Sequence, residues 1–254
     1  MKHTLLLLLA LTLFGSANAQ AVDASIRKVA IVSLIGDVMT VDTYRPRVGT
    51  GIDSNQQEQV PVQSPVFDHA AIFAAVDALA PLLPASSVSA LAVPAAGSGA
   101  DPNRLLADGP IPPSSALVAS LRQSGFSHLL LISKHRGLAR LQLKDVAVGS
   151  GHLRGIGFYI DHNLRVKNED TAEIARGFIA PYVYIRLTLL DLATLDTRAE
   201  QTIGASETWS AAGNEKGFDP WGAITPDQKV ASLKRLIEAN VAAAAPLLVR
   251  AKAP

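Results

Sequence analysis

The chain has 254 residues, of which 48% are hydrophobic, with 23 Lys and Arg, 22 Asp and Glu, and no cysteine. This length is enough to bury a sizeable core, and the near balance of charge lacks the basic excess of nucleic-acid binders. We therefore expect no nucleic-acid partner. The absence of cysteine excludes disulfides, thiolate metal sites, a cysteine nucleophile and a lipid anchor on a cleavage-site cysteine.

Residues 1–19 have the three parts of a secretory signal peptide. Lys2 supplies a positive charge, Thr4–Phe14 is a largely apolar run, and Ala17-Asn18-Ala19 is a small-x-small exit. The run is shorter than the roughly 20 residues that span a bilayer, although a retained N-terminal anchor is the alternative. We predict cleavage after Ala19, a periplasmic or secreted location, and no stable membrane insertion of the mature chain.

The first half of the chain alternates strand-like and helical patterns. An apolar β-branched run at 28–33 predicts a buried strand, and strand character resumes at 38–44. The next pattern predicts a helix over 69–83, N-capped by Asp68 and with Phe73 in the core. A buried strand over 88–93 is expected to follow it. A second helix, from Pro113 or Ser114 to Gly125, then leads to a strand over 126–133. Because helices join these strands, the β-α-β-α-β order predicts parallel pairing.

Polar stretches rich in Pro and Gly at 45–66 and 94–113 predict long loops, the first with a hint of an edge strand near Val60. The second half carries a half-buried strand over 139–144, a charged stretch over 162–176, a hairpin of 180–192 with 197–209, and a closing helix from Thr225. The charged stretch predicts a solvated loop with a short helix, or alternatively a lid. We predict an α/β fold, a single three-layer domain over 20–254 with a mixed sheet, an antiparallel hairpin and a C-terminal helix.

One segment resembles the first block of the GDSL-type esterases. Ile35-Gly36-Asp37-Val38 follows the first strand, but Val38 stands where those enzymes have their nucleophilic serine, and no histidine follows His162. A secreted hydrolase would therefore need a site that the fold assembles from distant polar residues. The candidates for such a site are Asp37, His135, His152, Asp161 and His162.

These histidines, with His128 in an apolar strand, lack the compact spacings of metal-binding motifs. We predict no metal site and no cofactor, and a buried His128 with a solvated His162 is the alternative to a ligand role. The glycines at 149–157 precede strand-forming residues instead of a helix, which disfavours a phosphate-binding loop.

Aromatic residues in two regions are candidates for a binding surface. These are Phe158, Tyr159, Trp209 and Trp221. The alternative is that they cover the edge of the core where the hairpin meets the last helix.

The order of strands at 28–33, 90–93 and 125–133 and the later hairpin resemble small α/β domains of bacterial envelope proteins. Examples are the N-terminal domain of the TolB translocation protein, the curli-secretion lipoproteins and the penicillin-binding-protein activator lipoproteins. The shared turn, Leu-x-Asp-x-x-Thr, is Leu189–Thr194 here. The chain departs from them in having no lipobox cysteine, no propeller repeats and long insertions.

The sequence thus favours a soluble exported envelope protein that binds a protein partner without catalysis. A secreted hydrolase built around Asp37 and the central histidines and a small-ligand binding module are the two alternatives.

Overall fold

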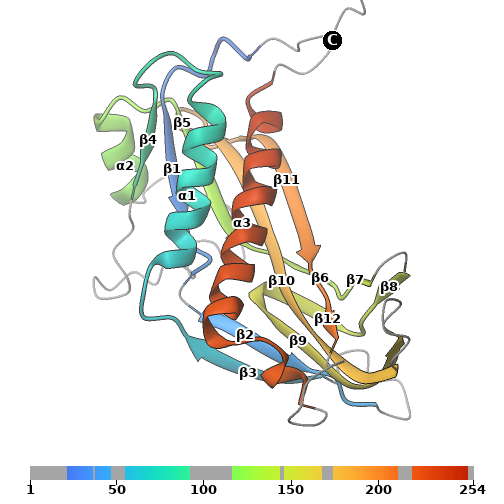
Figure 1. Cartoon of the computed structure of the whole chain (residues 1–254). Helices are drawn as coiled ribbons and strands as arrows, with labels where there is room; N and C mark the ends of the chain where they lie inside the picture. The colour runs from blue at the N-terminus through green and yellow to red at the C-terminus, as the bar shows by residue number, and fades with distance from the viewer. Residues whose placement is uncertain are drawn as a thin grey trace, which may run out of the picture.

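The computed structural model describes residues 22–36, 38–46, 55–91, 116–143, 146–167, 174–210 and 219–250. The predicted signal peptide at 1–19 and the predicted loop at 94–113 lie outside these residues, as does Asp37. The elements, in chain order (Figure 1), are β1 (Val29–Ser33), β2 (Val38–Thr43), β3 (Gln56–Pro61), α1 (Val66–Leu79), β4 (Val88–Ala90), α2 (Ala116–Gln123), β5 (His128–Lys134), β6 (Arg136–Leu138), β7 (Leu141–Leu143), β8 (Val146–Val148), β9 (His152–Lys167), β10 (Ile174–Asp191), β11 (Thr197–Ser206), β12 (Trp209–Ser210), the 3-10 turn η1 (Pro220–Ala223) and α3 (Pro226–Leu248).

The strands form a mixed sheet in the order β3-β2-β9-β10-β5-β1-β4. β1 pairs in parallel with β4 and β5, and β2 pairs in parallel with β9, whereas β10 is antiparallel to its neighbours. The long strand β10 joins the two ends of the sheet, because it pairs with β9 over Ile174–Tyr184 and with β5 over Ile185–Asp191. β11 pairs with the opposite edge of β10, and β7 and β8 form a separate two-stranded sheet.

Helices α1 and α3 lie side by side across one face of the sheet (Figure 1). Alternate strand residues such as Ile31, Ile132 and Ile185 point toward them and form the main core. On the other face, α2 packs through Val118 and Leu121 over one end of the sheet only. The mixed α/β sheet, the hairpin and the C-terminal helix are confirmed, but the second face does not carry a full helical layer.

Further along that second face lies a covering layer that includes Ala139, Leu141, Val148 and Leu153. Its apolar side chains pack on a row of aromatic residues from β9 and β10. These are Tyr159, Phe178, Tyr182 and Tyr184. Tyr182 and Tyr184 alternate along β10 with Val183 and Ile185, which belong to the main core, so both faces of this strand are buried.

Local signals in the second half are confirmed in atomic detail. Thr225 and Gln228 form a reciprocal capping box at the start of α3, with Pro226 in its first turn. In the turn between β10 and β11, the Asp191 carboxylate accepts from the Ala193 N–H at 2.8 Å. The charged stretch differs from its prediction, because β9 continues to Lys167 and β10 begins at Ile174; residues 168–173 lie outside the described part.

Two predictions for the first half are wrong. Helix α1 begins at Val66 with Pro65 as its N-cap and no side-chain cap. Asp68 is not the N-cap, because its carboxylate accepts from the Ile35 N–H at 2.9 Å in the connection that follows β1. The strand expected over 88–93 is a three-residue edge strand, Val88–Ala90, and is not buried.

Candidate functional site

The predicted catalytic residues that the structure describes do not all lie together. His152 begins β9, whereas Asp161 and His162 lie nine and ten residues further along the same strand, which at about 3.3 Å per residue is roughly 30 Å. Asp161 is buried and accepts hydrogen bonds from the N–H groups of Asn163 and Leu164 at 2.6 and 3.0 Å. His162 is exposed.

His135 lies just beyond β5, where its Nδ1 is 3.2 Å from Nη2 of Arg186. Burial, and then the charge of Arg186, lower the pKa of His135. Within the described ranges, no group of three His, Cys, Asp or Glu side chains is placed to hold a metal ion. His128 is buried, with Nδ1 at 3.0 Å from the Ser127 hydroxyl.

Two of the aromatic candidates, Phe158 and Tyr159, are fully buried on opposite faces of β9. Phe158 contacts the ring of Trp221 edge-on at 5.5 Å, and the Lys229 ammonium lies 4.2 Å from the centre of that Trp221 ring. Lys229 also donates to the carbonyls of Trp221 and Ile224, both at 2.7 Å. Phe158 thus holds η1 against the sheet and Lys229 holds it against the first turn of α3. Trp209 and Trp221 keep about a third of their surface exposed, at 37% and 36%.

A buried carboxyl group, on strand β2, belongs to the second face of the sheet, opposite α1 and α3. Asp42 is fully buried and accepts hydrogen bonds from the Tyr182 hydroxyl and the Gln57 amide, each at 2.6 Å. Burial raises the pKa of Asp42, although both hydrogen bonds act in the opposite direction. The folded protein therefore binds this proton more tightly than the unfolded chain does.

We expect Asp42→Asn to gain stability relative to the wild type as the pH rises from 4 to 8. The neutral acid stabilises the fold fully below the ordinary pKa of 3.8, and this contribution is lost as the pH rises through the raised pKa. Asparagine never ionises and keeps one oxygen to accept from Tyr182, while its NH₂ group would face Gln57, whose amide can turn its own oxygen toward it. Urea unfolding of both proteins between pH 4 and pH 8 measures the difference, which must grow with pH; a difference that shrinks with pH would contradict this prediction.

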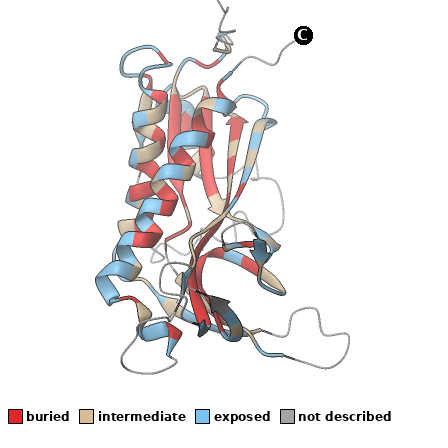
Figure 2. Ribbon diagram, turned by 45° about the vertical axis from the view of Figure 1, so that its right-hand side comes forward, coloured by how far each residue is buried: buried red, intermediate tan, exposed pale blue. Residues whose placement is uncertain are grey.

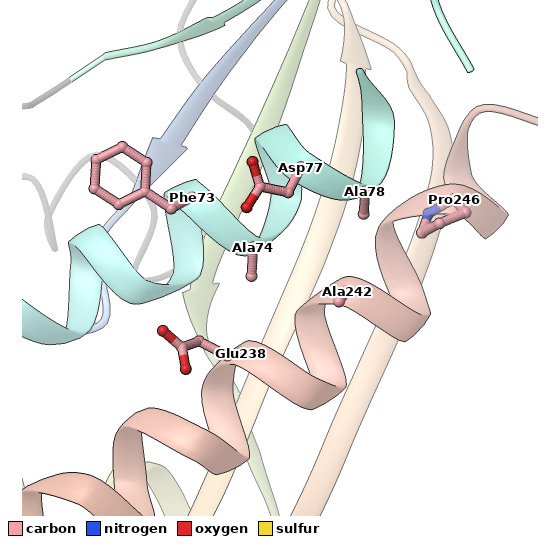
Figure 3. A pocket seen from close by; sticks show the side chains of 7 residues that line it. All are labelled: Phe73, Ala74, Asp77, Ala78, Glu238, Ala242 and Pro246. Carbon is pink, nitrogen blue, oxygen red and sulfur yellow. The ribbon is translucent and has the colours of Figure 1, made fainter. Parts of the chain in front are cut away.

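The outer faces of α1 and α3 enclose an open groove of about 510 Å³ (Figure 3). Figure 2 shows the inner faces of these helices buried and their outer faces exposed. The groove is lined by Phe73, Ala74, Asp77, Ala78, Glu238, Ala242 and Pro246. Phe73 is 59% exposed, the largest exposed fraction of any aromatic ring among the described residues.

The placement of Phe73 differs from its predicted place in the core. Helix α1 is apolar around most of its circumference, so Ile72 faces the sheet while Phe73, the next residue, faces outward. A helix with a second apolar face needs a second surface to cover it, and this signal is visible in the sequence. The opposing wall, from α3, is far away in the sequence and only the fold brings it here.

The polar side chains that line the groove, Asp77 and Glu238, are both carboxylates. Asp77 makes no ion pair with the described residues, and Glu238 pairs with Lys234 at 3.5 Å along the same helix. Pro246 lies inside α3 and has no N–H, so the carbonyl of Ala242, four residues earlier, loses its helical partner. The groove thus offers apolar surface and two carboxylates.

No family model and no curated protein matches the sequence. Among solved structures, the crystal structure of a DUF330 protein from Xanthomonas campestris is similar over 91% of this chain and 90% of its own, at 8% identity and a TM-score of 0.38. A PelC dodecamer from Paraburkholderia phytofirmans is similar over 92% and 96%, at 12% identity and a TM-score of 0.30. At these TM-scores the two similarities are too weak to assign a family or a role to this chain. The resemblance to TolB and the lipoprotein families stays a prediction.

Proposed function

We propose that this chain is an exported envelope protein that binds a protein partner, without catalysis, through the groove between α1 and α3. The observation that carries the proposal is the exposed Phe73 beside a groove lined largely by alanine and proline. An exposed apolar surface of this kind marks an interaction site in a folded protein. A large aromatic residue at such a site is the usual anchor of an interface.

The shape of the groove supports a protein partner. It lies open along two exposed helices (Figure 3), and its lining has little hydrogen-bonding variety. Pockets for small molecules enclose most of the ligand and place several kinds of polar group around it. His152 lies roughly 30 Å along β9 from Asp161 and His162, which gives a hydrolase less support than a binding role.

Site-specific photo-cross-linking in cells that export the protein tests this proposal. A photoreactive amino acid at Phe73 or at Ala242 is expected to yield the same cross-linked protein, because both positions line one groove. Gln59 is the control, since it is exposed on β3. Adducts that form from Gln59 and not from either groove position would contradict the proposal.

A further inference from the structure

We infer that the segment bound in the groove between α1 and α3 is a basic amphipathic helix, with apolar residues over the alanines and a lysine or arginine that reaches Asp77 and Glu238. This inference rests on the proposed function and adds the chemistry of the partner. Three features of the groove support it: its length, its polar groups and its charge.

The length of the groove fits a short helical segment. The lining residues run from Glu238 to Pro246 on α3, which at 1.5 Å per residue is roughly 12 Å, or about two helical turns. The small side chains of Ala74, Ala78 and Ala242 allow another backbone to approach closely. Partner helices of this class present apolar anchors one and two turns apart.

Every polar group of the groove accepts hydrogen bonds. The carboxylate oxygens of Asp77 and Glu238, the polar side chains that line the groove, are hydrogen-bond acceptors. A bound segment must therefore bring donors. Lysine and arginine carry donors and no acceptor, so they match this lining better than any other side chains.

The charges of the groove favour the same occupant. Asp77 on α1 and Glu238 on α3 flank the groove, and Lys234 is an exposed partner of Glu238 at 3.5 Å. An exposed pair of this kind is weak, so an incoming cation can compete for Glu238. The alkyl stem of a lysine or arginine would cover the alanine methyl groups while its head reaches the carboxylates.

Two labelled helical peptides of equal length test the inference by fluorescence anisotropy. Both carry leucines one and two turns apart, and they differ only in having lysine or glutamate beside the leucines. The lysine peptide is expected to bind the wild-type protein at least tenfold more tightly than the glutamate peptide, with an affinity that falls as salt is added. The double variant D77K/E238K is expected to reverse this preference.

The variant Glu58→Lys, on exposed strand β3, is the matched control and is expected to keep the preference for the lysine peptide. Equal binding of the two peptides, binding of neither, or a preference that D77K/E238K leaves unchanged would overturn the inference. Cross-linking from Phe73 is independent of these peptides. If it succeeds while the peptide preference fails, the groove is an interface for a partner of different chemistry.

Discussion

Replacing Gly157 with alanine is expected to lower the free energy of unfolding by about 3 to 5 kcal/mol. A Cβ atom at this position would lie 1.9 Å from the backbone oxygen of Thr40 and 2.8 Å from the hydroxyl of Tyr182. Thr40 pairs with Gly157 in the parallel ladder of β2 and β9, so the strand itself would have to move. Urea unfolding followed by circular dichroism measures the loss.

Gly204→Ala is the matched control. Gly204 is exposed on β11, and the atom nearest to its added Cβ is a ring carbon of Tyr184 at 3.4 Å, an ordinary contact. We expect a change within about 0.5 kcal/mol, as for most surface substitutions. Equal losses from the two alanine variants would show that close packing at Gly157 is not what holds β2 in place.

The packing at Gly157 also explains the tyrosine hydroxyl in the buried network. Tyr182 lies opposite Gly157 in the ladder of β9 and β10, so its ring can extend across the glycine to reach Asp42 at 2.6 Å. The sequence shows glycines at 155 and 157, which lie inside β9. It does not show which side chain crosses them, because the partner residue comes from another strand.

The elements predicted correctly from the sequence have strong local signals. The β-branched run at 28–33, the apolar run at 126–133 and the capping box at Thr225 each specify their element within a few residues. Such signals depend on neighbours in the chain, which the sequence shows directly. The burial of the second face depends instead on residues that are distant in the chain, since Tyr184 is covered by the segment after Ala139.

The residues of the candidate site are harder to predict from the sequence, because their neighbours in space are distant in the chain. Phe158 and Tyr159 belong to the core, because a strand in the middle of a sheet covered on both faces buries both of its sides. The helical spacing of Phe73 predicts a place in the core, although α1 has more apolar residues than one buried face needs. The acids that flank the groove come from two helices, and only the tertiary fold places them together.

Asp68→Ala is expected to lower the free energy of unfolding by about 2 to 4 kcal/mol. The carboxylate accepts from the Ser33 hydroxyl at 2.6 Å, from the Ile35 N–H at 2.9 Å and from the Gly36 N–H at 3.2 Å. Ile35 and Gly36 are buried, so their N–H groups would lose their partner away from water, and each such group costs about 1 to 3 kcal/mol. Urea unfolding measures the loss.

Asp77→Ala offers the same substitution on the same helix, at an exposed carboxylate that makes no ion pair with the described residues. It is expected to change stability by no more than about 0.5 kcal/mol. Asp68→Asn should lie between the two alanine variants, because its amide oxygen can replace Oδ1, which accepts from Ser33, Ile35 and Gly36, while its NH₂ group would face the Gly36 N–H that Oδ2 also accepts. If Asp68→Ala unfolds at the same urea concentration as Asp77→Ala, the carboxylate does not hold the connection after β1. In that case the contacts of Asp68 with Ile35 and Gly36 would not explain why α1 begins at Val66 without a side-chain cap.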